Sequence, residues 1–293
     1  MKKTVYLCAT ALMLAAVSCG GGQSGQSSDN QAQNQEQKQE ENVQKQSKAF
    51  PWDYPEGIKG PGLEDGCHAL VPSNVYVTAE NPADEMYVFT EVTIKKVGDK
   101  ASVFQGDGIM NVELPNSLII PLSKNQTAKV GDVVITWNQS GWDCLRRAIV
   151  TDATNPAQPK VAYLDVNWDD AQKQLDEQLE AGSFTVLKSN EWQPGQSVVY
   201  DLDGHDEILI VVSVSDTKVL ANRFDGKIHV LDRSKCTLIP TDAQFKVGDK
   251  VRGQAFGMIS DGFKVKRVDA RNGRLWFDDV LGETNMTILE VLK

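Results

Sequence analysis

The chain has 293 residues, of which 30 are lysine or arginine and 40 are aspartate or glutamate, so its formal net charge at pH 7 is −10. Proteins that bind the phosphate backbone of nucleic acids need clustered basic residues, and this balance therefore predicts no nucleic-acid partner. After the first twenty residues the chain has no run of eighteen apolar residues, which predicts that no helix of the folded part spans a membrane.

The first nineteen residues predict secretion. Two lysines, at positions 2 and 3, precede a mostly apolar stretch over residues 4–15 that is too short to span a bilayer. Ala16, Val17 and Ser18 then form a small-residue cleavage site directly before Cys19. This pattern resembles the lipobox of bacterial lipoproteins, although Ala16 stands where leucine is usual. The resemblance implies a signal peptide over residues 1–18 and acylation of Cys19, which would anchor the protein to a membrane. An ordinary secretory signal with a chance cysteine is the alternative.

Residues 19–48 predict a disordered tether behind that anchor. They consist mainly of Gly, Gln, Ser, Asn, Glu and Lys, and so cannot bury enough apolar surface to offset their chain entropy. A flexible coil of about thirty residues reaches roughly 30 Å. Gly20 is not the aspartate that is linked to inner-membrane retention in some lipoproteins, so the resemblance implies the outer membrane. The sequence leaves open whether the protein faces the periplasm or the outside.

Three cysteines remain in the folded part, Cys67, Cys144 and Cys236. In an oxidising compartment an odd number allows at most one disulfide within the chain. Each of them lies in a strand-like context, which favours small buried side chains. The sequence leaves the pairing open.

The folded part repeats itself. The tetrapeptide Lys-Val-Gly-Asp occurs at residues 96–99, 129–132 and 246–249, and residues 193–196 are a looser copy. A β-branched closing pattern recurs at residues 117–120, 184–187, 236–239 and 286–289. These repeats predict four units, which we call the first, second, third and fourth unit: residues 50–122, 126–188, 191–240 and 244–293. The copy at residues 96–99 falls inside the first unit and is interpreted as a turn, whereas Gly66 would open that unit.

Each unit predicts β-structure. Residues 133–137, 208–212 and 263–268 are rich in β-branched or aromatic side chains, and Asn-Gly or Asp-Gly turns separate such runs. Short strands at this spacing favour small barrels or a sandwich. Because a unit of this size has only a marginal core, we expect the units to pack together.

One helix is predicted near residues 169–181. Ala171, Leu175 and Leu179 recur at helical spacing, acidic residues lie in the first turn, and Gly182 follows as a stop. We expect it to pack one unit onto its neighbour. The predicted fold class is therefore all-β, with tandem small barrels and one short connecting helix.

The second unit resembles Tudor and related SH3-like barrels. It has Gly131-Asp132-Val133 at a strand start, an Arg-Ala-Ile-Val strand at residues 147–150, and a strand that ends Tyr163-Leu164-Asp165. The close match covers about forty residues, and fragments such as Arg223-Phe224-Asp225-Gly226 extend it loosely to the other units. The resemblance implies that the tandem barrels are SH3-like.

Tudor domains hold a methylated lysine or arginine in an aromatic cage by cation–π attraction. Carried over to this chain, the resemblance implies a cage built from Trp137 or Trp142, Tyr163 and Trp168, with Asp165 as the acidic partner. The alternative is that Trp137 and Tyr163 pack in a core or between barrels.

Patterns for catalysis and metal binding are weak. The three histidines lack the spacing of zinc ligands, and neither a Cys-x-x-Cys pair nor a Gly-x-Ser-x-Gly elbow nor a phosphate-binding glycine loop is present. Residues 201–206 have an acidic spacing like that of a calcium loop, but Val212 stands where an EF-hand has glutamate. We therefore expect no metal, no cofactor and no catalysis.

The sequence favours a lipid-anchored binding or scaffold protein of the cell envelope. Its expected partner is an extended peptide or a protein surface that lies in a groove on the tandem barrels, besides the membrane itself. Two alternatives stay open. One is a cell-wall module that binds peptidoglycan or another glycan, and the other is a hydrolase with a site between units.

Overall fold

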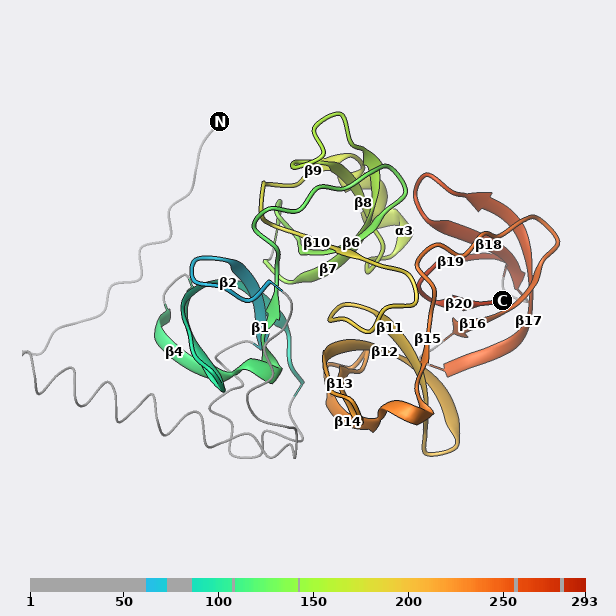
Figure 1. Ribbon diagram of the computed structural model, residues 1–293. Coiled ribbons are helices and arrows are strands. Elements are labelled where there is room, and N and C mark those ends of the chain that lie inside the picture. The colour runs from blue at the N-terminus through green and yellow to red at the C-terminus, as the bar shows by residue number, and fades with distance from the viewer. Residues whose placement is uncertain (1–61, 73–85, 107–108, 142, 256–257, 280–281) are drawn as a thin grey trace, which may run out of the picture. The chain divides into compact units, whose positions relative to one another are not determined.

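Four antiparallel sheets of five strands each make up the fold among the residues that the structure describes. The computed structural model in Figure 1 describes residues 62–72, 86–106, 109–141, 143–255, 258–279 and 282–293. All of these residues belong to one compact body, Glu41–Lys293. The predicted signal peptide, Cys19, the tether and Trp142 lie outside the described residues. No helix within the described part is long and apolar enough to cross a membrane.

The first two units contain half of the strands. The first unit consists of β1 (His68–Pro72), β2 (Phe89–Val97), β3 (Ala101–Gly106), β4 (Ile109–Pro115), the 3-10 turn η1 (Asn116–Leu118) and β5 (Ile120–Pro121). The second unit consists of β6 (Val133–Trp137), β7 (Leu145–Asp152), β8 (Lys160–Tyr163), α3 (Trp168–Ala171), η2 (Gln172–Gln174), β9 (Glu177–Gln178) and β10 (Thr185–Leu187).

The other two units repeat this succession. The third unit consists of β11 (Ser197–Leu202), β12 (His205–Val214), β13 (Lys218–Asn222), β14 (Ile228–Asp232), η3 (Arg233–Lys235) and β15 (Thr237–Leu238). The fourth unit consists of β16 (Lys250–Ala255), β17 (Met258–Asp269), β18 (Arg274–Asp279), β19 (Gly282–Thr287) and β20 (Val291–Leu292).

All four units share one topology. Within each unit the first four strands form a meander, and the short fifth strand pairs with the free side of the first. The orders β4-β3-β2-β1-β5 and β10-β6-β7-β8-β9 are the same arrangement written from opposite ends. The all-β prediction is confirmed, and the common strand order agrees with tandem small barrels of the SH3-like kind.

The same glycine turn opens every unit. Gly66, Gly131, Gly195 and Gly248 all have a φ between 73° and 94°, a left-handed conformation that favours glycine. Each donates its N–H to a carbonyl oxygen of the second strand, and the oxygens belong to Ile94, Val150, Val211 and Val265. The prediction that Gly66 opens the first unit is confirmed. In the Lys-Val-Gly-Asp copy at residues 96–99, the first two residues end β2 and the last two lie between β2 and β3, which confirms its interpretation as a turn.

The predicted helix is much shorter than its sequence pattern. Only Trp168–Ala171 is α-helical, and a 3-10 turn then leads into β9. Of the predicted apolar stripe, Ala171 and Leu179 are buried, whereas Leu175 is 37% exposed. The chain leaves the helix because Asp176 takes a left-handed φ of 59° and accepts a hydrogen bond from Thr151 Oγ1 at 2.6 Å, which brings β9 beside β8. Tertiary pairing therefore overrides helical propensity here.

Two kinds of core coexist in the molecule. Each unit has its own apolar cluster, and a further cluster takes side chains from all four units. In β6, for example, Val134 points into the core of the second unit, while Val133 and Ile135 point into the shared cluster. The strand is thus buried on both faces, and the expectation that the units pack together is confirmed.

The three cysteines of the described part are free thiols. Cys67 and Cys144 are buried and Cys236 is half-buried, so the prediction of small buried side chains is confirmed for two of them. Burial raises the pKa of the Cys67 thiol, and it raises the pKa of Cys236 to about 11.

Candidate functional site

A cavity of about 840 Å³ is lined by residues of all four units. We call it the inter-unit cavity. Its walls come mainly from residues 86–89 of the first unit, residues 144–147 and 164–168 of the second, and residues 222–226 of the third, while the fourth unit contributes single side chains such as Arg274. This volume lies in the range of small-molecule and peptide-binding sites.

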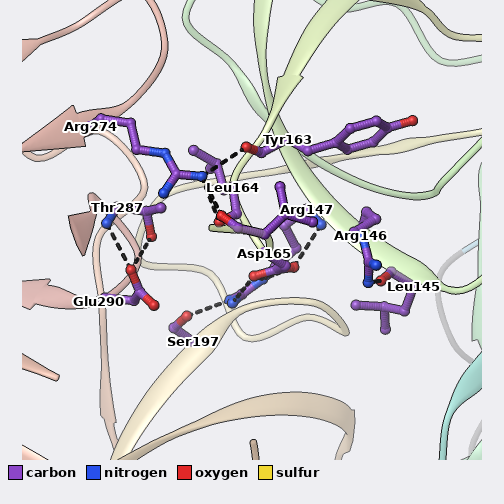
Figure 2. Close-up of polar contacts among 11 residues, drawn as sticks. Leu145, Arg146, Arg147, Tyr163, Leu164, Asp165, Ser197, Arg274, Thr287 and Glu290 are labelled. Carbon is purple, nitrogen blue, oxygen red and sulfur yellow. Dashed lines mark hydrogen bonds and ion pairs between the residues drawn. The ribbon is translucent and has the colours of Figure 1, made fainter. Parts of the chain in front are cut away.

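A buried ion pair from the second unit lies on one wall of the cavity. Arg147, in β7, is buried, and its Nη2 lies 2.6 Å from Asp165 Oδ1, while Nε and the backbone N–H donate to the same carboxylate. Its Nη1 donates to Ser197 Oγ of the third unit. Figure 2 shows this chain of contacts from Asp165 through Arg147 to Ser197. The pair therefore both compensates two buried charges and links two units.

Arg274 enters the cavity wall from β18 of the fourth unit. Its Nη2 donates to the carbonyl oxygens of Tyr163, Leu164 and Val166, at 3.2, 3.3 and 2.6 Å. Figure 2 shows its guanidinium beside Tyr163 and Leu164. Its Nη1 donates to Asn285 Oδ1 at 3.2 Å. Within the described residues no carboxylate pairs with Arg274, and its Nε has no acceptor. Burial lowers the pKa of this guanidinium.

Glu290 lies nearby, in the turn between β19 and β20. Its carboxylate accepts from the N–H and the Oγ1 of Thr287, at 2.7 and 3.0 Å. Protein surrounds most of the carboxyl group, although part of the residue stays open to the cavity. Burial raises the pKa of Glu290, against the opposing effect of its hydrogen bonds from Thr287.

A second arginine pair comes from the third unit. Arg223 follows β13, and its Nε and Nη2 lie 2.5 and 2.8 Å from the carboxylate oxygens of the buried Glu207. Its Nη1 donates to Asp225 at 3.1 Å. The hydrogen bonds with Glu207 raise the pKa of Arg223. The same guanidinium lies 5.0 Å from the centroid of the Phe224 ring.

Exposed apolar side chains form the rim of the cavity. Met86, Val88 and Phe224 are 58%, 41% and 64% exposed, and they are three of the seven large apolar side chains that are exposed in the described part of the chain. The Tyr87 N–H donates to the Gly226 carbonyl oxygen at 2.8 Å. This bond fixes the first-unit segment beside the third-unit turn, so the apolar rim spans two units.

The structure separates the residues of the predicted cage. Trp137 is buried in the shared cluster, where its ring lies 5.1 Å from that of His68. Tyr163 is buried in the core of the second unit, and its hydroxyl donates to the Trp137 carbonyl oxygen at 3.3 Å. Only Asp165 and Trp168 line the inter-unit cavity. Trp142, the fifth predicted residue, lies outside the described residues.

The two predicted residues that line the cavity are already engaged. The carboxylate of Asp165 is bound by Arg147. The ring of Trp168 packs edge-on against Trp276 at 5.5 Å and lies 5.6 Å from the Arg274 guanidinium. These contacts make Trp168 and Asp165 part of the cavity wall.

The sequence analysis did not predict several of the charged and apolar residues that line the cavity. Arg274, Glu290 and Met86 carry no local pattern, because they meet only when distant units pack together. The fragment at residues 223–226 was the one available signal, since it places an arginine and an exposed phenylalanine at a predicted turn.

Comparisons with protein-family models and with curated proteins find no match for this chain. Among the described residues, no group of three or more His, Cys, Asp or Glu side chains is arranged to hold a metal ion.

Proposed function

We propose that this protein is a lipid-anchored, non-catalytic binding protein of the bacterial cell envelope. It holds a peptide, or a segment of another protein, in the inter-unit cavity. Acylation of Cys19 anchors it to the outer membrane, and residues 19–48 hold the folded part away from the lipid surface. The anchor and the tether rest on the N-terminal sequence, while the binding role rests on the cavity.

The apolar rim is the observation that carries this proposal. Exposed apolar side chains gathered around one cavity mark a surface that a partner covers. Burial of Met86, Val88 and Phe224 by a ligand removes their apolar surface from water, at about 25 cal/mol per Å². A cavity of about 840 Å³ accommodates several peptide residues.

The charged groups of the cavity support binding over catalysis. Asp165 is held by Arg147, and Asp225 lies within 3.1 Å of Arg223, so neither carboxylate is poised to exchange a proton with a substrate. Glu290 is bound by Thr287. These groups position one another and fix the shape of the walls.

Capture from envelope extract tests the proposal. The bait is the full chain in mild detergent, beside a Phe224→Ser variant and a matched Val247→Ser control, and quantitative mass spectrometry measures the captured proteins. Val247 is 69% exposed, lies in the turn before β16 and does not line the inter-unit cavity, so its substitution removes similar apolar surface elsewhere. A protein that is captured by the wild type and the control but lost from Phe224→Ser supports the proposal.

Two outcomes contradict it. Equal capture by all three baits moves the binding site away from the cavity. Retention on purified cell wall, without a protein partner and without an effect of Phe224→Ser, favours the glycan-binding alternative instead.

A further inference from the structure

The inter-unit cavity has a surplus of hydrogen-bond donors. Four arginines line it, Arg146, Arg147, Arg223 and Arg274, and each guanidinium carries five N–H donors and no acceptor. Within the described residues, the Nε atoms of Arg146 and Arg274 are buried without an acceptor. Arg146 donates from Nη1 to the Leu145 carbonyl oxygen at 2.9 Å and pairs with no described carboxylate.

The carboxylates of the cavity do not balance these donors. Three of them line it, and Asp165 and Asp225 are both bound to arginines. The third, Glu290, accepts hydrogen bonds from Thr287 and pairs with no described arginine. A further carboxylate, Glu207, does not line the cavity but is bound to Arg223. Arg146 and Arg274 are therefore the two lining arginines without a carboxylate partner among the described residues, in a chain whose formal net charge is −10.

The aromatic rings at this site already face cations. The Arg223 guanidinium lies 5.0 Å from the Phe224 centroid, and that of Arg274 lies 5.6 Å from the Trp168 centroid. A cationic ligand would compete with both arginines and meet their repulsion. The site therefore favours a ligand that brings acceptors and negative charge.

We infer that the inter-unit cavity recognises an acidic peptide segment in which a carboxylate side chain stands beside a large apolar one. The carboxylate faces the arginines of the walls, with which it forms charge-assisted hydrogen bonds. The apolar side chain covers Met86, Val88 and Phe224 on the rim. This inference rests on the proposed function and specifies the chemistry of its partner.

The acidic surface of the protein adds selectivity. Because the chain as a whole is strongly negative, an acidic peptide is repelled from most of the surface and attracted only where positive charge is unpaired. The apolar rim excludes a bare anion as the preferred ligand, since an inorganic phosphate buries no apolar surface.

Selection from a random short-peptide display library on the immobilised full chain tests the inference. The expected sequences carry Asp or Glu within two positions of Leu, Ile, Met, Phe or Trp. The strongest peptide is then synthesised with its acids replaced by amides, Asp by Asn and Glu by Gln, and both forms are titrated by fluorescence anisotropy. We expect the amide form to bind about tenfold or more weakly, because it loses charge-assisted hydrogen bonds.

The position of the site is tested by the same titration on Phe224→Ser and on the Val247→Ser control. Binding of the acidic peptide should fall in the first variant and stay unchanged in the second. Selected sequences that are basic or lack an acidic bias overturn the inference, as does equal affinity of the acid and amide forms or an unchanged affinity in Phe224→Ser. A library that yields no binder also overturns it.

The experiments distinguish failure of the proposed binding function from failure of the inferred ligand chemistry. If envelope extract yields a partner that depends on Phe224 but peptides show no acidic preference, the binding function stands and the ligand chemistry is wrong. If neither a partner nor a peptide depends on Phe224, both proposals fail.

Discussion

The two faces of strand β7 pack against different parts of the molecule. In β7, Ala148 and Val150 point into the core of the second unit, whereas Arg147 and Ile149, between and beside them, point toward the other units. Ala148 and Val150 on the inner face are both apolar, while the outer face carries both an aliphatic residue and a buried arginine. Alternation along a strand thus divides it into a face that makes the unit and a face that joins the units and builds the cavity.

The largest expected effect comes from the inner face. Tyr163→Ala removes a buried side chain from the core of the second unit, and we expect it to lower the free energy of unfolding by about 3–5 kcal/mol. Chemical denaturation measures this change. Tyr163→Phe is the control, because it keeps the ring and loses only the hydroxyl, which donates to the Trp137 carbonyl and accepts from the Gln139 N–H; this loss should cost about 1 kcal/mol. Equal losses in the two variants would contradict a packing role.

A loss nearly as large is expected on the outer face. Arg147→Ala leaves the half-buried carboxylate of Asp165 without its cation, and should lower the free energy of unfolding by about 3 kcal/mol. The double variant Arg147→Leu/Asp165→Leu removes both charges and should recover much of this loss in the same denaturation experiment. A double variant that is less stable than Arg147→Ala would show that the pair contributes more than mutual compensation.

A smaller, pH-dependent effect is expected where the first unit meets the second. His68 Nδ1 lies 2.7 Å from Glu91 Oε1, and this hydrogen bond raises the pKa of His68 in the folded state. A raised pKa contributes stability that is fully present below the unfolded-state value of about 6.5 and is lost as pH rises through the folded-state value. The melting temperature of the wild type should therefore fall relative to that of His68→Gln as pH rises through this range. Parallel pH profiles of the two proteins would contradict the assignment.

The smallest effect on stability belongs to the rim. Phe224 is largely exposed, so Phe224→Ser should change the free energy of unfolding by no more than about 0.5 kcal/mol while it weakens ligand capture. Thermal unfolding beside the capture experiment checks both halves of this prediction. A large loss of stability would mean that the rim serves the fold and not a ligand.

Sequence patterns predicted the features that depend on neighbouring residues alone, which are the opening turns and the strands. The opening glycines were recognisable because each unit needs a residue in the left-handed conformation at the same turn. In the second and fourth units the aspartate of Lys-Val-Gly-Asp also accepts a hydrogen bond from a backbone N–H of that turn, at 2.9 and 3.0 Å. The strands were recognisable from their β-branched runs. The helix was overestimated, because spacing alone does not show that Asp176 pairs with Thr151 and draws the chain into a strand.

The site was predictable only in part, for a related reason. Alternation places Val133, Ile135 and Trp137 on one face of β6, but it does not show whether that face meets water or another unit. Trp137 proved to be covered by the first unit, whereas Asp165, which follows β8, and Trp168, which begins α3, line the cavity. Which strand faces become exposed depends on how the units pack against one another. That packing produces no periodic pattern of residues in the sequence, so the sequence could not predict it.

The shared cluster also explains which parts of the repeat still look alike. Because the outer face of each unit packs against different neighbours, four identical units could not all fill their contacts well, and each face requires side chains of its own size and shape. The opening turns of the second and fourth units have no such constraint: a Cβ atom at Gly131 or Gly248 would meet no atom within 4 Å, and only the backbone conformation restricts the residue. At Gly195, by contrast, a Cβ atom would lie 2.8 Å from the Ile135 side chain. Duplicated units that assemble into one body should therefore diverge first along their strands and last at their turns.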